Sequence, residues 1–308
     1  MIALQPLLSR LVDYAGLFPP AQLTMHAAVQ RYADHRRGEH SWMLNRFIVP
    51  IARLGEFDQA FSSLPGEEEE NVGEPWRISA IGGRGPDSDL RAILDFNRRH
   101  GEAGRPAVIE AIELKVLSRQ ELEPAADLAS EPLEVYAEVP AATDPDAWIA
   151  AAADAGLRVK VRAGGVTPEM FPPAADLARF LSTCARRKVG FKATAGLHHA
   201  LRGERPLSDD PSAARVLMHG FLNVFLAASL AYTCGITTEQ VENVLEERSI
   251  KAFEFGEDGV AWRGRRVTSA DFAAVRRSFA IAYGSCSFGQ PVADLTDLGL
   301  LRNASVGE

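Results

Sequence analysis

Short β-rich runs alternate with helical stretches along most of this chain, and this repeat is the feature that most constrains its fold. Segments with apolar residues at helical spacing lie between runs that have the composition of buried strands. The units repeat at roughly 25 to 35 residues, about the length of a βαβ element. Seven such runs stand out, at residues 46–51, 76–83, 111–116, 133–140, 157–165, 190–196 and 250–255.

A closed barrel of parallel strands needs an eighth strand, and the segment LVDYAGLF (11–18) is the candidate. We therefore predict an α/β fold, a (β/α)8 TIM barrel that forms a single domain over residues 1–308. Residues 250–255 would be the last barrel strand, and FEFGEDGVAWRGRRV (253–267) would add a C-terminal β-hairpin to it. The apolar residues 212–232 would either cover the barrel or form a dimer interface, so a homo-oligomer stays open.

Composition favours a small-molecule partner. The net charge is -8, and no stripe of basic residues is interleaved with aromatics, which argues against a nucleic-acid partner. The most apolar segment, residues 220–235, is too short to span a membrane. Three widely spaced cysteines without a Cys-x-x-Cys pair argue against a disulfide framework and a zinc knuckle. We expect a cytoplasmic protein with a small-molecule substrate, and no nucleic-acid or membrane partner.

Charged residues occupy one face of several predicted strands. Successive side chains of a strand point to opposite faces, so each barrel strand has one face toward the interior. Burying unpaired charges costs several kcal/mol each, and barrel active sites lie at the carboxyl ends of the strands. We therefore predict an active site there, with an internal salt-bridge network as the alternative. Four consecutive strands point these charges inward: Glu113, Lys115, Glu138, Lys160, Arg162 and Lys192.

These four strands resemble those of a known family. The stretches AIELK, EVYAEV, RVKVRAGG and VGFKATAGL follow the order and the approximate spacing of E-I-D-M-V, K-V-I-L-E-T, F-V-K-T-S-T-G and V-G-V-K-A-S-G-G-I in the deoxyribose-phosphate aldolases. Those proteins are class I aldolases, which form a Schiff base on a (β/α)8 barrel without a metal cofactor. The resemblance covers about residues 108–200 and implies a lyase in a remote bacterial branch of the barrel aldolases.

The resemblance also implies residue roles. Lys160 falls on the Schiff-base lysine, and Lys192 falls on the second lysine, which perturbs the first. Glu113 matches a proton-handling aspartate, and Glu138 matches a glutamate of less defined role. The chain departs from the family pattern where an arginine replaces a small hydroxyl residue, where an alanine replaces a phosphate-loop glycine, and where two histidines have no counterpart. These positions are Arg162, Ala195, His198 and His199.

The lysines suggest carbonyl chemistry. An amine attacks a carbonyl only when neutral, and a desolvated cavity with neighbouring cations favours the neutral form. Lys160 would have Arg162 and Lys192 as such neighbours. The iminium that forms draws electrons from the adjacent carbon, and Glu113 would move the protons. We predict a Schiff-base aldolase or lyase that acts on a small carbonyl compound, an oxo acid or a sugar-phosphate-like substrate.

Polar side chains around the lysines would hold this substrate. Arg162 can bind a carboxylate or phosphate through its planar fork. The other candidates for substrate contact are Lys115, Tyr136, Glu138, Thr194 and His198.

Two other functions compete. His198 or His199, with Glu138 and Asp13, could hold a divalent metal that stabilises an enolate, although adjacent residues of an extended chain point opposite ways. Alternatively, the barrel would only bind a small molecule, and its inward charges would then pair completely and leave no open pocket. The roles of DYAGLFPP (13–20) and GSCSFGQP (284–291) stay open at this point.

Overall fold

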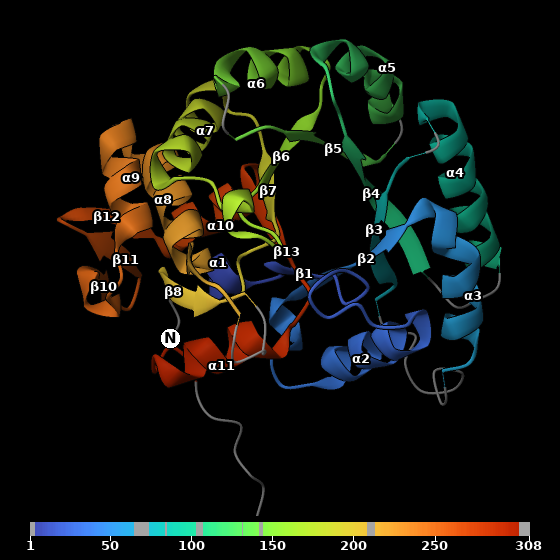
Figure 1. Cartoon of the computed structure of the whole chain (residues 1–308), viewed down its shortest axis with the longest axis horizontal. Coiled ribbons are helices and arrows are strands. Elements are labelled where there is room, and N and C mark those ends of the chain that lie inside the picture. Colours follow the sequence, from blue (N-terminus) through green and yellow to red (C-terminus); the bar gives the residue numbers. More distant parts are fainter. Residues whose placement is uncertain are drawn as a thin grey trace, which may run out of the picture.

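The computed structural model describes residues 4–64, 74–83, 85–102, 107–130, 132–141, 144–207 and 213–301. Its centre is a closed barrel of eight parallel strands in the order β1-β13-β7-β6-β5-β4-β3-β2 (Figure 1). The predicted (β/α)8 barrel is therefore confirmed. The barrel strands are β1 Val12–Tyr14, β2 Leu44–Pro50, β3 Trp76–Ile81, β4 Ala107–Lys115, β5 Glu134–Val139, β6 Arg158–Arg162, β7 Phe191–Thr194 and β13 Ala280–Ser285.

Helices surround the barrel (Figure 1). The helices are α1 Gln5–Leu8, α2 Met25–Arg37, α3 Leu54–Ser62, α4 Pro86–Glu102, α5 Leu122–Ala125, α6 Pro145–Asp154, α7 Ala174–Arg187, α8 Phe221–Cys234, α9 Thr238–Glu246, α10 Ser269–Ser278 and α11 Gly289–Asp297. Short 3-10 turns lie at Ser41–Met43, Ile51–Arg53, Arg119–Glu121, Ala126–Ser130, Pro168–Met170 and Ile250–Ala252. Within the ranges given above, every helix is too short or too polar to cross a bilayer.

The first barrel strand lies where the sequence placed it, but the prediction of the last one is wrong. Residues 250–255 do not close the barrel. Their strand β10 (Phe253–Phe255) belongs to a separate antiparallel sheet with β11 (Gly259–Trp262) and β12 (Arg265–Thr268), so the predicted hairpin exists but is not attached to a barrel strand. The closing strand is β13, which pairs with β1 and β7.

The sequence of β13, AIAYGS, explains why its role was missed. It has small residues where buried strands usually have Val and Ile, so it lacks the β-rich signal. Ala282 pairs in register with Lys192, and Gly284 pairs with Thr194. We infer that these small residues leave room inside the barrel for the long lysine side chain.

The hydrophobic core lies between the barrel and its helices. On β5, Val135, Ala137 and Val139 are buried in this core, as period-2 alternation predicts. Helix α8 is buried from Phe221 to Ala231, so this part of the apolar segment packs within the chain. Two short strands, β8 (Gly203–Pro206) and β9 (Arg215–Met218), form a separate antiparallel pair.

Candidate active site

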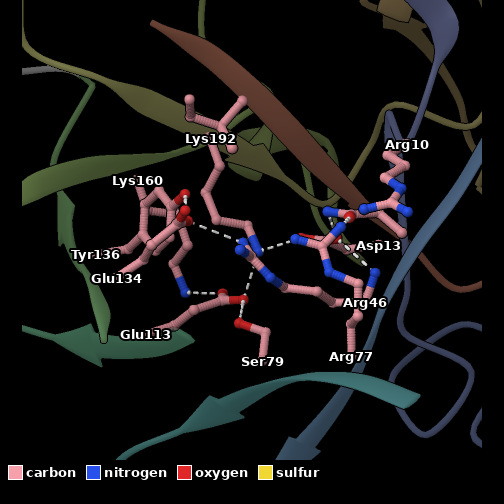
Figure 2. A network of polar contacts seen from close by, with 12 residues as sticks. Arg10, Asp13, Arg46, Arg77, Ser79, Glu113, Glu134, Tyr136, Lys160 and Lys192 are labelled. Carbon is pink, nitrogen blue, oxygen red and sulfur yellow. Dashed lines mark hydrogen bonds and ion pairs between the residues drawn. The ribbon is translucent and has the colours of Figure 1, made fainter. Parts of the chain in front are cut away.

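Lys192 lies at the centre of the barrel, wholly shielded from solvent. Its Nζ is 2.5 Å from Asp13 Oδ2 and 2.5 Å from Glu113 Oε1, and it lies 5.4 Å from the ring centre of Tyr136 (Figure 2). Burial alone would lower the pKa of Lys192, but the two carboxylates more than offset it and raise the pKa above its ordinary value. Lys192 is therefore held as an ammonium at neutral pH.

Charged side chains form a row inside the barrel, from Lys192 through Glu113, Lys160 and Glu138 to Arg162. Lys160 is the second cation of this row. Its Nζ is 3.0 Å from Glu113 Oε2 and 2.8 Å from Glu138 Oε2. Arg162 ends the row, with its Nε 3.2 Å from Glu138 Oε1. The sequence predicted that Lys160 has two cations as direct neighbours. Instead, Glu113 separates it from Lys192 and Glu138 binds both it and Arg162, so the charges alternate in sign.

Glu113 is the carboxylate that joins the two lysines. Burial alone would raise its pKa, but Lys192 and Lys160 more than offset this and hold the pKa well below its usual range. The Ser79 hydroxyl also donates to Glu113 Oε1, at 2.7 Å. With both oxygens occupied, Glu113 is better suited to fix the charge arrangement than to shuttle protons, the role that the resemblance implies.

Asp13 is held in place by hydrogen bonds in addition to its ion pair with Lys192. Its Oδ1 accepts hydrogen bonds from Asn45 Nδ2 at 2.6 Å and from the backbone N–H of Arg46 at 3.1 Å. Sequence reasoning missed both Asn45 and Ser79. Ser79 could have been found, because it alternates with Ile78 and Ala80 in β3 and therefore shares the inward face.

A cavity of about 380 Å³ opens above this row of charges, at the carboxyl ends of the strands. Lys160, Glu113 and Glu138 reach it, and Lys115 and Arg162 lie at its rim. Only 6 % of the Lys160 side chain is exposed, so its amine meets the cavity at the floor. The cavity shows that the mouth of the barrel is open. If the inward charges served only to pair with one another, no pocket would be expected.

The predicted substrate-contact residues divide into two groups. Thr194 and His198 line the cavity beside Lys115, Glu138 and Arg162. Tyr136 is not brought to the cavity, because it is wholly buried and its hydroxyl donates to Glu134 at 2.6 Å. The placement is consistent with contact for the first group only.

The predicted metal ligands do not converge. His199 Nδ1 lies 3.0 Å from Asp294 of α11, and Asp13 is occupied by Lys192. Across the described residues, no three His, Cys, Asp or Glu side chains form a group that could hold a metal ion. The proposed set of His198, His199, Glu138 and Asp13 is therefore not assembled.

The two segments whose roles were open both line the cavity. Phe18, Pro19 and Pro20 from DYAGLFPP form part of its wall, and so does Cys286 from GSCSFGQP. Cys286 Sγ lies 3.9 Å from His198 Nδ1. Burial raises the pKa of Cys286 and lowers that of His198 to about 4, so both groups are neutral at pH 7.

A second cluster of charges fills the amino-terminal end of the barrel. Arg46 lies 3.0 Å from Glu134 (Figure 2). It also lies 3.0 Å from Glu110, and Arg158 lies 2.7 Å from Glu134. Burial alone would raise the pKa of Glu134, but the two arginines more than offset it and lower the pKa to about 2. This cluster is a separate salt-bridge network, distinct from the six inward charges for which the sequence allowed one, and none of these four residues lines the cavity.

Comparison with known proteins does not identify the activity. No family model matches the chain, and no curated protein matches it. Among solved structures, UMP synthase of Leishmania donovani is similar at 11% identity and a TM-score of 0.38, over 96% of this chain and 74% of that one. The spore cortex-lytic enzyme SleL of Bacillus cereus is similar at 9% identity and a TM-score of 0.31, with the same coverage. Likenesses this weak carry no argument about function, and none supports the aldolase resemblance.

Proposed function

We propose that this protein is a lyase of the class I aldolase type, in which Lys160 forms an iminium with a small carbonyl compound. The observation that carries the proposal is the position of the Lys160 amine. It lies at the floor of an open cavity between two carboxylates, at 3.0 Å and 2.8 Å. Lys192, the other candidate, is wholly buried beneath the cavity and occupied by Asp13 and Glu113.

Attack requires a neutral amine, so a proton has to leave Lys160 Nζ first. Both Glu113 and Glu138 line the cavity, but Glu138 is the better acceptor, because 14 % of its side chain is exposed against 1 % for Glu113. Glu138 binds two cations, Lys160 and Arg162, whereas Glu113 binds two ammonium groups and also accepts from a hydroxyl. In this proposal, Glu138 carries the proton and Glu113 balances the charge of Lys192.

The reaction then needs only water from outside the site. The Lys160 nitrogen forms a bond to the carbonyl carbon, and Glu138 returns its proton to the oxygen. Glu138 then moves a second proton from the nitrogen to the same oxygen, and the C–O bond breaks to release water and leave the iminium. The iminium accepts the electron pair of a neighbouring C–C or C–H bond and becomes an enamine, while Glu138 takes the proton of that C–H bond or of the hydroxyl on the fragment that leaves as a carbonyl compound. Protonation of the enamine carbon and addition of water release the product and the free amine.

The test is reductive trapping. Borohydride delivers hydride to an iminium and leaves a stable secondary amine, which adds the mass of the carbonyl fragment to the protein. We expect a panel of small aldehydes and 2-oxo acids to give such an adduct on the wild type and none on Lys160→Ala. Lys251→Met, which changes an exposed lysine of the 3-10 turn before β10, is the matched control and should be trapped like the wild type. Failure to label the wild type with any compound would sink the proposal.

A second candidate function, small-molecule binding without turnover, is favoured by one observation. Both lysine amines are ion-paired with carboxylates, as this alternative predicts, although its prediction of a barrel without an open pocket is wrong. This alternative predicts that small carbonyl compounds bind in the cavity, detected by ligand-observed NMR, with no covalent adduct and no product.

A further inference from the structure

Two cations at the rim of the cavity have hydrogen-bond donors that no described residue accepts from. Lys115 is exposed at the end of β4, and its ammonium has no hydrogen-bond or ion-pair partner in the described part of the chain. Arg162 binds Glu138 through Nε, while 43 % of its side chain is exposed. Its two terminal nitrogens are not engaged by any described residue. A planar guanidinium beside an ammonium is suited to bind a carboxylate.

The cavity also has an apolar lining. Phe18, Ile48 and Ile81 contribute to it from the loop after β1, from β2 and from β3. Exposed large hydrophobic side chains lie on the loops after β4 and β6, the strands that carry Lys115 and Arg162. Of the four in the described ranges, three surround the cavity or the groove that adjoins it at Arg162, namely Leu117, Val166 and Met170. Cations at the rim together with apolar surface in one cavity fit a ligand that has one anionic end and an apolar body.

The strand register sets the order of these groups. Lys115 pairs with Glu138, and Glu138 pairs with Lys160, so the three lie side by side on β4, β5 and β6. Arg162 is two residues beyond Lys160 on β6, which is about 6.5 Å further toward the mouth. An anion held by Lys115 and Arg162 therefore lies above the Lys160 amine. The lining groups comprise three cations, Lys115, Lys160 and Arg162, and two carboxylates, so one negative charge balances the cavity.

We infer that the substrate is a monoanionic 2-oxo acid with an apolar side chain. Its carboxylate binds Lys115 and Arg162, its ketone carbon meets the Lys160 nitrogen, and its apolar body packs on Ile48, Ile81 and the neighbouring wall. This inference rests on the proposed function for the role of Lys160. The bond-making step is the one given above, in which the ketone oxygen leaves as water and the carboxylate is unchanged.

The test compares three probes on the wild-type protein: 4-methyl-2-oxopentanoate, its neutral methyl ester, and pyruvate, which lacks the apolar body. We expect the branched oxo acid to half-saturate borohydride trapping at a concentration at least about tenfold lower than either of the others. A hydrogen bond to a charged group, which the ester lacks, is worth a factor of that order, and so is the burial of the apolar carbons that pyruvate lacks. Equal half-saturation for the three probes would overturn the inference.

Variants locate the subsite. Lys115→Met and Arg162→Met should each shrink the preference for the acid over its ester, and Lys251→Met, the matched lysine control, should keep it. A preference that survives both rim substitutions would overturn the assignment to these two residues.

Binding measured by ligand-observed NMR without borohydride separates this inference from the proposed function. Selective binding of the oxo acid without any trapping would refute the Schiff base and retain the anion subsite. Trapping without selectivity would refute the subsite alone. If the protein shows neither binding nor trapping, both the Schiff base and the anion subsite are refuted.

Discussion

Lys192 has a carboxylate 2.5 Å away on each side and no contact with solvent. A buried ion pair contributes little net stability when intact, but removing one partner leaves an uncompensated buried charge. In this protein, removal of Lys192 would leave two such charges, on Asp13 and Glu113. The alternation of charge along the barrel interior therefore contributes to the stability of the fold.

We predict that Lys192→Met lowers the free energy of unfolding by about 3 to 5 kcal/mol, the range for breaking a buried pair. Urea denaturation followed by circular dichroism measures the change. The double variant Asp13→Asn/Lys192→Met removes one of the stranded charges, so it should be more stable than the single variant. A single variant within about 1 kcal/mol of the wild type would contradict this account of the buried charges.

The pKa of Glu134 leads to a prediction about acid stability. Its folded-state pKa of about 2 lies below the ordinary value of 4.5, so its contribution to stability is present above pH 4.5 and is lost as the pH falls toward 2. One such group adds at most about 1.4 kcal/mol per pH unit to the slope. We expect Glu134→Gln to be less stable than the wild type at pH 7 and to lose stability less steeply below pH 4.5. Parallel pH profiles for the two proteins would refute the assignment.

At the scale of elements, Arg276 on α10 links the segment before β1 to the start of β13. Its Nε donates to the Leu7 carbonyl at 2.9 Å, and its Nη2 donates to the carbonyls of Ser9 and Arg10, both at 3.0 Å. Its Nη1 donates to two carbonyls at the start of β13. Because β1 and β13 are the first and last barrel strands, one guanidinium joins the segments that close the barrel.

We predict that Arg276→Met lowers the free energy of unfolding by at least about 3 kcal/mol, because several carbonyls lose their donor together. Arg277→Met is the matched control, since Arg277 is the next residue on the same helix and is exposed. We expect the control to change stability by no more than about 0.5 kcal/mol. Equal effects of the two substitutions in thermal denaturation would show that the carbonyl contacts of Arg276 are unimportant.

The same closing strand marks how far the sequence could predict the elements. Strands such as β4 and β5 were predictable, because their alternating apolar and charged residues indicate both that the segment is a strand and which of its faces points inward. The strand β13 was not, because Ala, Gly and Ser in AIAYGS suit the space around Lys192 and carry no strand propensity. Contacts that join distant segments, such as Arg276 with residues 7–10, have no local signal at all.

At the scale of the whole molecule, the sequence predicted which residues gather but not how their charges pair. Strand alternation was sufficient to direct Glu113, Lys160 and Lys192 into one interior. The order in which carboxylates and amines alternate depends on the stagger between strands, which a single sequence does not state. The cavity wall likewise needs the loops after β1 and β13, whose positions follow only from the closed barrel.

Which amine meets the carbonyl compound is the most direct test of this account. The measurement is tandem mass spectrometry of the peptides after borohydride reduction of the wild-type protein with 4-methyl-2-oxopentanoate or a small aldehyde. The account predicts the secondary amine on Lys160, because that amine alone of the two reaches the cavity floor. An adduct on Lys192, or no adduct on any lysine of the barrel interior, would contradict it.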